Sequence, residues 1–411
     1  MVFISLITHF VLHILCNLKF YCIFAPEFGV FFMIIGMENP FTIKSYESKE
    51  LFCDREEELQ LMLRNCINST DMTLISKRRM GKTGLILRLF DELKDVRPDI
   101  HTIYFDIFAS RNVDDFIKLM AEAAMKSFPE KTSMGGKLLK FIKSLRPQLS
   151  FDNITGEPQL QIAYQTAHEK EYTLKGLFDF LDSQNEHIVI AIDEFQQIRD
   201  YPEQNMEALL RTYIQQTHNL TFVFCGSKKH MMADIFANEK KPFYNSTTFV
   251  SLDRISEESY STFIRRLFGD RQRSITDEAL QFILVWTRRH TYYTQQLCHT
   301  VYANGSLDIN IEDVKKACEQ LMKQGEAVYL QYRQMLTDKQ WGYLIAVAKE
   351  GSVQQITAND FLKNHKIGTP SVSRRLAEAL CEKGLLNDDA TLEGTIYSLS
   401  DVFLSHWMER L

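Results

Sequence analysis

The chain has 411 residues, of which 45% are hydrophobic and 24% are charged, and its formal net charge is −6. This length accommodates two or three domains, each with its own core, and the composition is ordinary for a globular protein. The negative net charge argues against a protein coated in positive charge for nucleic-acid binding, although a local basic patch stays compatible with it. The eight cysteines form no C-x-x-C pair and the histidines no H-E-x-x-H pattern. We therefore expect neither a disulfide framework nor a metal site built from cysteine or histidine ligands.

The first 36 residues differ from the remainder, because they are strongly apolar and only Lys19 and Glu27 are charged. They lack the basic residues and the small-residue cleavage site of a signal peptide. The apolar part, 2–18, is about the minimum length of a membrane span, but two histidines and an asparagine interrupt it. The sequence Met37-Glu38-Asn39-Pro40-Phe41 looks like the start of a cytosolic protein. We therefore expect Met37 to be the true start of a cytoplasmic protein with no stable membrane association; a membrane anchor formed by 1–36 is the alternative.

An extended, polar and aromatic stretch at 39–51 precedes a predicted helix that runs to about Cys66. Asp54 is its expected N-cap, and three glutamates follow in the first turn, where the helix dipole favours negative charge. For Arg55 two interpretations stay open. It belongs to an ordinary capped surface helix, or it points back to a bound nucleotide.

The segment 76–83 ends in Gly-Lys-Thr, between a short apolar strand at 72–75 and an amphipathic helix that begins at 84. Strand, tight turn, Gly-Lys-Thr and helix is the context of a phosphate-binding loop, in which backbone N–H groups and the helix N-terminus face the phosphates. Ser76 stands where the pattern has its first glycine. The predicted nucleotide-binding residues of this loop are Ser76, Lys77, Arg78, Arg79, Met80, Gly81, Lys82, Thr83 and Gly84.

A strand at 101–106 and a helix at 113–128 follow, and 129–171 reads as an excursion with one short helix at 137–144. The next motif is an apolar run from 188 to 192 that ends in Asp193 and Glu194. It predicts a buried parallel strand that delivers two acids at its carboxyl end, where ligands sit in open α/β sheets. Asp193 fits the acid that holds Mg²⁺ together with Thr83, and Glu194 fits the base that polarises the attacking water. Such a strand is common alone, but with Gly81-Lys82-Thr83 upstream it forms a strong pair.

A helix at 206–216 and a buried strand at 220–225 complete the predicted core. Ser227, which follows that strand, is a candidate sensor of the γ-phosphate or the attacking water; a simple strand-to-helix turn is the alternative. The γ-phosphate also needs a neutralising cation. Arg211, Lys228 and Lys229 are the candidates, and the sequence does not choose between them.

Four amphipathic helices are predicted at 256–268, 277–286, 292–303 and 311–336. Beyond them, helices at 338–350, 357–365 and 371–383 precede two short strands, with a turn expected at Asn387-Asp388-Asp389. Three short helices and a hairpin fit a winged helix. Its third helix carries Arg374 and Arg375 near its N-terminal end, where a recognition helix meets DNA. A module for protein interaction or regulation is the alternative, since the wing is acidic.

These residues resemble a family of P-loop ATPases of the STAND/AAA+ group that is common in archaea and bacteroidete bacteria. The resemblance covers about 38–411. Three motifs carry it, at 52–58, 76–83 and 188–194, and the segments 222–227 and 242–244 support it. The first motif is the family's apolar-x-Gly-Arg-Glu signature, here with Asp54 in place of the glycine. It implies an α/β P-loop core with a helical lid. Members carry Gly-Gly-His-Pro in the lid, where this chain has Arg288-Arg289-His290-Thr291. Either arginine is a candidate sensor, and ordinary basic residues of the surface are the alternative.

Together these observations predict a parallel sheet flanked by helices, a helical lid and a C-terminal winged helix. The expected divisions are an N-terminal extension at 1–36, an ATPase core at 37–250, the lid at 251–336 and the winged helix at 337–411. The expected function is that of a Mg²⁺-dependent ATPase switch, with Lys82 and Glu194 as catalytic residues and ATP and Mg²⁺ as cofactors. The alternative is an ATP-responsive DNA-binding regulator with little turnover. Protein partners and self-association stay open.

Overall fold

The structure is a computed structural model that describes residues 39–44, 46–144, 170–391 and 393–411 in full. Only the backbone is described for five short stretches at 21–23, 32–34, 148–151, 158–161 and 167–169. The first two are strands β1 (Tyr21–Ile23) and β2 (Phe32–Ile34), which pair with each other. The prediction that the protein starts at Met37, and its alternative of a membrane anchor formed by 1–36, concern residues that lie mostly outside the described part of the chain. Within the described part of the chain, no helix is both long and apolar enough to cross a membrane.

The core is a five-stranded sheet in which all neighbouring strands are parallel. In spatial order its strands are β4 (His101–Asp106), β7 (Ile188–Asp193), β8 (Leu220–Gly226), β3 (Met72–Ile75) and β9 (Thr248–Ser251). Every residue of β3, β7 and β8 is buried, as apolar runs in the middle of a parallel sheet must be. Because the strands are parallel, the residues that follow β3, β7 and β8 meet at one edge.

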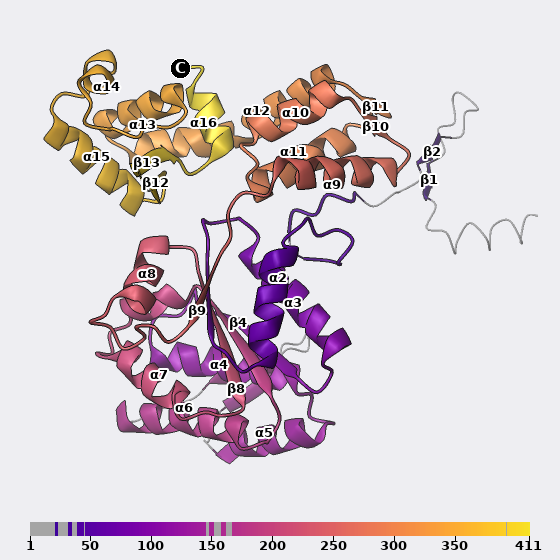
Figure 1. The fold of residues 1–411 in the computed structure, drawn as a ribbon, viewed down its shortest axis with the longest axis vertical. Coiled ribbons are helices and arrows are strands. Elements are labelled where there is room, and N and C mark those ends of the chain that lie inside the picture. The colour runs from indigo at the N-terminus through magenta and orange to yellow at the C-terminus, as the bar shows by residue number, and fades with distance from the viewer. Residues whose placement is uncertain are drawn as a thin grey trace, which may run out of the picture.

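Helices cover both faces of the sheet, as Figure 1 shows. Helices α2 (Glu56–Ile67) and α3 (Lys82–Val96) pack on one face, through Met62 of α2 and through Leu85 and Leu89 of α3. The opposite face carries α4 (Val113–Ser127), α5 (Ser133–Ser144), α6 (Ala167–Asp182), η1 (Phe195–Asp200), α7 (Met206–Ile214) and α8 (Lys229–Ala237). A hairpin of β5 (Gln148–Phe151) and β6 (Pro158–Gln161) lies between α5 and α6 in the chain. The predicted α/β class with a parallel sheet is therefore confirmed.

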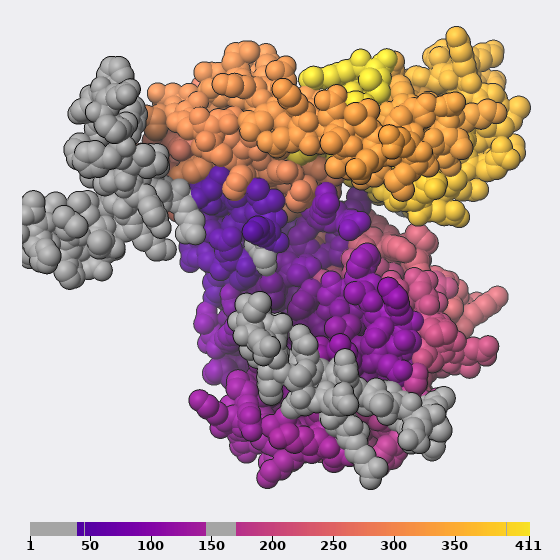
Figure 2. All heavy atoms as spheres, turned by 180° about the vertical axis from the view of Figure 1, so that it is seen from behind, coloured from indigo at the N-terminus to yellow at the C-terminus, as the bar shows by residue number. Residues whose placement is uncertain are grey.

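Two helical units follow the sheet and lie in a row across one end of the core (Figure 1), where they form a continuous band in Figure 2. The first, called the lid, comprises α9 (Glu257–Gly269), β10 (Ser274–Ile275), α10 (Asp277–Trp286), α11 (Thr291–Ala303), β11 (Asp308–Ile309) and α12 (Ile311–Met335). The second, the winged helix, comprises α13 (Asp338–Glu350), α14 (Asn359–Asn364), α15 (Pro370–Glu382), β12 (Leu386–Thr391), β13 (Gly394–Leu399) and α16 (Val402–Met408).

The last helix, α16, attaches the winged helix to the lid. Val402 and Phe403 are part of the lid's hydrophobic core, and the ring of His406 stacks on Trp286 with centroids 4.5 Å apart. Helix α12 also joins the two units, since its first half packs in the lid while Tyr329 packs in the core of the winged helix. The lid and the winged helix are therefore joined by packed side chains of both α12 and α16.

Two local predictions are wrong. Asp54 is not the N-cap of α2; the cap position is Arg55, and no side chain caps this helix. Both residues have positive φ, 57° and 75°, which turns the chain before the helix begins and leaves the Asp54 carboxylate without a capping bond. The turn of the wing is not at Asn387-Asp388-Asp389, which belong to β12. It lies between Thr391 and Gly394, whose φ of 127° suits glycine.

Candidate nucleotide-binding site

The loop between β3 and α3 has the geometry of a phosphate-binding loop. Gly81 has a φ of 95°, a left-handed conformation that favours glycine, and it is the last residue before α3. Ser76 does not have a positive φ, so the first glycine of the pattern is not needed there. The Ser76 side chain is buried, and its hydroxyl donates to the Lys77 carbonyl at 2.9 Å. Serine therefore preserves the loop.

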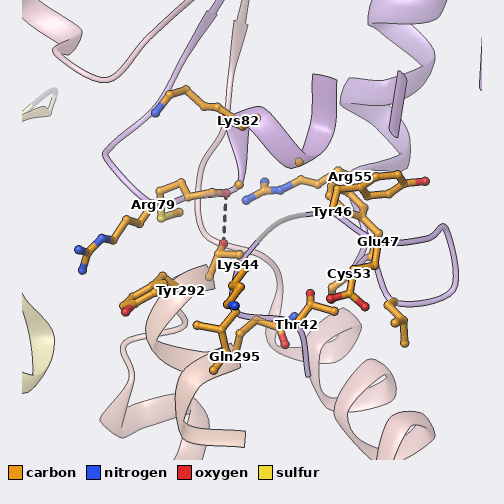
Figure 3. A pocket seen from close by; sticks show the side chains of 18 of the residues that line it. Thr42, Lys44, Tyr46, Glu47, Cys53, Arg55, Arg79, Lys82, Tyr292 and Gln295 are labelled. Carbon is orange, nitrogen blue, oxygen red and sulfur yellow. Dashed lines mark hydrogen bonds between the residues drawn. The ribbon is translucent and has the colours of Figure 1, made fainter. Parts of the chain in front are cut away.

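Lys82, the first residue of α3, is buried inside the loop. Its Nζ donates to the carbonyl oxygens of Ser76 and Lys77 at 3.4 and 3.1 Å and to the Ser76 hydroxyl at 3.3 Å. These oxygens hold the ammonium group beside the backbone of the loop. Figure 3 shows Lys82 and Arg79 on the same side of the pocket that the loop borders. An anion bound to the loop thus meets a cation that is already in place.

The two predicted acids come together with Thr83 at the carboxyl edge of the sheet. The Thr83 hydroxyl donates to Asp193 Oδ2 at 2.7 Å, and the Glu194 N–H donates to Asp193 Oδ1 at 2.9 Å. Asp106 ends β4 directly opposite Asp193. Burial and the charges of Asp193 and Glu194 raise the pKa of Asp106. Three carboxyl groups at one edge therefore favour a cation.

Two further side chains that contact or approach Asp193 were not predicted. The Tyr104 hydroxyl donates to Asp193 Oδ2 at 3.0 Å. Cys225, at the end of β8, is fully buried beside it. Burial and the negative charge of Asp193 raise the pKa of both Tyr104 and Cys225, so both stay protonated near neutral pH.

Glu194 is held by two side chains in a strained backbone conformation. Its φ is 54°, in the left-handed region, which costs a non-glycine residue about 1–3 kcal/mol. The Ser227 hydroxyl donates to Glu194 Oε2 at 2.7 Å, and the Gln196 amide donates to the same oxygen. The candidate sensor Ser227 is therefore brought to Glu194. Gln196 was missed because a glutamine in a 3₁₀ turn gives no sequence signal.

A pocket of about 380 Å³ opens beside the loop. The extended stretch before α2, the phosphate loop and helix α11 contribute its walls, and Figure 3 shows Tyr292 and Gln295 of α11 facing the loop. The Thr291 hydroxyl donates to the Met80 carbonyl at 3.2 Å, and the Arg79 guanidinium lies over the Tyr292 ring at 4.4 Å. The pocket is also lined by every predicted loop residue from Arg78 to Gly84, together with Arg55, Asp193 and Glu194.

Arg55 lines this pocket but is already bonded within the protein. Its guanidinium donates to the Asp253 carbonyl and forms an ion pair with Glu58 at 3.0 Å. Asp54, which precedes it, stands where the resembled signature has glycine. Asp54 has a left-handed φ, which explains why the signature has glycine at this position. Aspartate can replace it because it is one of the few other residues that adopt this conformation readily.

The Arg288-Arg289-His290-Thr291 segment forms the turn between α10 and α11. Arg288 and Arg289 have φ values of 55° and 52°, so two arginines adopt the left-handed conformation for which Gly-Gly is suited. Thr291 is the first residue of α11, a position that also suits proline. Neither arginine lines the pocket. Arg288 donates to Ser405 Oγ of α16 at 2.9 Å, and Arg289 donates to the Ile255 carbonyl at 3.4 Å.

The three other candidate cations also lie outside the pocket lining. Arg211 is near Asp71, which immediately precedes β3. That is the opposite edge of the sheet from the phosphate loop, so Arg211 does not reach the phosphates. Lys228 and Lys229 begin α8, next to Ser227. The structure therefore brings none of these three candidates to the pocket, whose lining already contains Arg78, Arg79 and Lys82 of the loop.

The wing of the winged helix reaches the phosphate loop. Lys77, inside the loop, forms an ion pair with Asp389 of β12, and both side chains are about one quarter exposed, 26% and 24%. The neighbouring Asp388 is exposed and is not part of this contact. This contact joins residues 312 positions apart, which no local pattern predicts.

The donor atoms at the edge of the sheet fit Mg²⁺ bound together with a nucleotide. The Thr83 hydroxyl and the Asp193 carboxylate are hard oxygen ligands, and Mg²⁺ is usually held by one or two such groups plus substrate phosphates. Among the described residues, no group of three or more His, Cys, Asp or Glu side chains could hold a metal ion alone. The site therefore suits a metal that arrives with the phosphates.

Comparison with known proteins places this chain in a family. The sequence model of an ATPase domain predominantly from Archaea matches residues 52–289, and that of a probable winged helix domain matches 327–410. No curated protein matches the chain.

Solved structures share the fold. The Walker-type ATPase PABY2304 of Pyrococcus abyssi is 17% identical, with a TM-score of 0.62, covering 90% of this chain and 100% of its own. The ORC2 protein of Aeropyrum pernix, solved with ADPNP and ADP, is 12% identical, with a TM-score of 0.57, covering 90% of this chain and 96% of its own. The family match extends over more than half of the chain and includes the phosphate loop and the acidic strand. The chain therefore belongs to the family of ATPase domains found predominantly in Archaea, and it carries a winged helix at its C-terminal end.

Proposed function

We propose that the protein is a Mg²⁺-dependent ATPase that works as a conformational switch. The observation that carries this proposal is the meeting of Lys82, Thr83, Asp193 and Glu194 at one edge of the sheet, beside a pocket lined by the phosphate loop. Phosphoryl transfer needs little from a protein beyond positioning and charge stabilisation, and these residues supply both.

Each residue has a distinct role in this proposal. Lys82 and the loop N–H groups bind the phosphates, while Thr83 and Asp193 hold the Mg²⁺, which neutralises charge that develops on the phosphate oxygens. Glu194 accepts a proton from the attacking water. In the described conformation its Oε2 is occupied by Ser227 and Gln196. Ser227 and Gln196 thus orient the carboxylate through Oε2, and Oε1 is the oxygen proposed to accept the proton.

Calorimetry of ATP binding to the full chain, with Mg²⁺ and with EDTA, tests the binding half of the proposal. We expect ATP to bind and Mg²⁺ to tighten the binding, because the paired carboxylates repel a metal-free polyphosphate. Absence of ATP binding under both conditions contradicts the proposal.

The lid and the wing supply the route by which nucleotide state reaches the winged helix. Thr291 and Tyr292 of the lid contact the loop at Met80 and Arg79, and Asp389 of the wing is paired with Lys77. A bound polyphosphate adds several negative charges next to Asp389. These charges weaken the attraction that holds the wing, so we propose that ATP binding loosens the wing from the loop.

The Asp389→Asn substitution tests this coupling. Linkage is reciprocal, so a contact that ATP weakens must itself weaken ATP binding. An exposed ion pair contributes up to about 1 kcal/mol, so we expect Asp389→Asn to tighten ATP binding about two- to fivefold. Asp388→Asn is the matched control, because it removes the same charge from the neighbouring, exposed position of β12. Equal ATP affinities of the two variants would exclude a role of the wing contact.

DNA binding through Arg374 and Arg375 is the second candidate function. Both side chains are exposed on the first half of α15, as this function requires. The wing, however, carries Asp388, Asp389 and Glu393, which repel a phosphate backbone, and this favours the switch over the DNA regulator. The DNA candidate predicts a gel-shift complex that weakens steeply with salt. Absence of a complex at low salt, with and without ATP, excludes it.

A further inference from the structure

Three N–H and O–H donors hold the carboxylate of Asp193. Oδ2 accepts from the Tyr104 hydroxyl at 3.0 Å and from the Thr83 hydroxyl at 2.7 Å, and Oδ1 accepts from the Glu194 N–H at 2.9 Å. Tyr104 belongs to β4, Thr83 belongs to α3, and Glu194 directly follows β7. Because bonds come from three elements, the carboxylate cannot rotate without losing at least one of them.

The register of the sheet explains why Tyr104 reaches this position. Asp106 of β4 lies opposite Asp193 of β7, and Tyr104 lies opposite Ala191. Side chains two positions apart on a strand share a face, so Tyr104 and Asp193 both point to the face that α3 covers. Ala191 has only a methyl group, which leaves room for the tyrosine ring to extend toward Asp193.

The environment makes the tyrosine hydroxyl important for this carboxylate. Asp193 is only 3% exposed, so water contributes little to stabilising its charge. A buried carboxylate is unfavourable unless hydrogen bonds satisfy its oxygens. Thr83 is also a proposed ligand of Mg²⁺. Among the side-chain donors with no proposed role toward the nucleotide, the Tyr104 hydroxyl is the strong one, since the thiol of Cys225 beside Asp193 is a weak donor.

We infer that Tyr104 is a positioning residue that fixes the orientation of Asp193 and thereby strengthens the binding of Mg²⁺ with ATP. This inference rests on the proposed function. Groups that hydrogen-bond to metal ligands fix their orientation, and their loss typically lowers metal affinity about 10- to 100-fold. The effect of Tyr104 is expected on the metal, because its hydroxyl bonds to Asp193 and also interacts with Thr83, the two proposed ligands of Mg²⁺.

The Tyr104→Phe variant of the full chain tests the inference. Phenylalanine keeps the ring and its packing and removes only the hydroxyl. In ATP titrations at a series of Mg²⁺ concentrations, we expect the Mg²⁺ concentration that gives half of the metal-induced increase in ATP affinity to rise about tenfold. ATP affinity in EDTA is expected to stay at the wild-type value, since the loop and Lys82 are unchanged. Calorimetry measures both quantities on the same protein.

Tyr201→Phe is the matched control. It also removes a buried tyrosine hydroxyl, which bonds to Ser110 Oγ at 2.6 Å and does not contact Asp193. We expect it to leave the Mg²⁺ requirement unchanged, and thermal unfolding will show whether both variants stay folded. If Tyr104→Phe has the wild-type Mg²⁺ requirement, Tyr104 is only structural and the inference is wrong. If Mg²⁺ has no effect on ATP binding by the wild type, the proposed function fails first, and the two outcomes are thus distinguishable.

Discussion

Replacing Lys82 by alanine is expected to lower the affinity for ATP by at least about 100-fold. The ammonium group sits inside the phosphate loop, where it bonds to oxygens of Ser76 and Lys77. A hydrogen bond to a charged group contributes about 1.5–3 kcal/mol, and a lysine that meets the outer phosphates makes more than one. The loss of two such bonds corresponds to a factor of 100 or more in Kd. Calorimetry or displacement of a fluorescent ATP analogue measures it.

Lys94→Ala is the control for this prediction. Lys94 lies in the last turn of the same helix and its side chain is 68% exposed, paired only with Asp91. The substitution removes the same charge about 18 Å from Lys82 along the helix axis, so ATP affinity should not change. Equal affinities of the Lys82→Ala and Lys94→Ala variants would contradict the assignment of the loop as the phosphate site.

Replacing Glu194 by glutamine is expected to preserve ATP binding and to lower turnover by about 10²- to 10⁴-fold, the usual contribution of a general base. Glutamine has the same size, and its carbonyl oxygen can still accept from Ser227 and Gln196, as the carboxylate does. It does not accept a proton from water. The nucleotide that stays bound after incubation with Mg²⁺ and ATP should therefore be ATP in this variant and largely ADP in the wild type. Chromatography of the released nucleotide distinguishes them.

Glu186→Gln provides the control for the loss of charge. Glu186 precedes the opposite end of β7, where it is paired with His101 at 2.7 Å and is 45% exposed. This variant should hydrolyse ATP at the wild-type rate. ADP recovered from the Glu194→Gln variant in the wild-type proportion would show that another group activates the water.

The parts of the site that are predictable from sequence are those in which the signal is local. The loop at 76–83 and the strand that ends in Asp193 and Glu194 each combine a run of buried strand residues with functional residues at its carboxyl end. A parallel sheet brings such ends together, so their proximity follows from the fold class alone. The resemblance to a family anticipated the lid. The pattern of three short helices and a hairpin predicted the winged helix, which the comparisons confirm.

The remaining parts depend on contacts between distant segments. Lys77 meets Asp389 across 312 positions, and Tyr104 reaches Asp193 only because of the register between β4 and β7. Strand β9 and helix α6 were not predicted. The four residues of β9 are too few to show a clear pattern, and α6 begins within the stretch that lacked a period.

The two wrong predictions share a physical cause. Asp54 and the acidic residues of β12 are of the types that favour helix caps and turns, and we assigned them accordingly. Backbone conformation and packing decided otherwise. Asp54 has a left-handed φ before α2. Asp389 pairs with Ile396 in the β12–β13 ladder, and its carboxylate forms an ion pair with Lys77.

Release of phosphate from ATP by the purified full chain tests the central claim most directly, when it is measured for the wild type and for Glu194→Gln at saturating ATP and Mg²⁺. We predict steady release by the wild type, none above background when EDTA replaces Mg²⁺, and release reduced at least about 100-fold by Glu194→Gln. No release by a folded wild type that binds ATP, or release at the wild-type rate by Glu194→Gln, would contradict the claim that this site hydrolyses ATP.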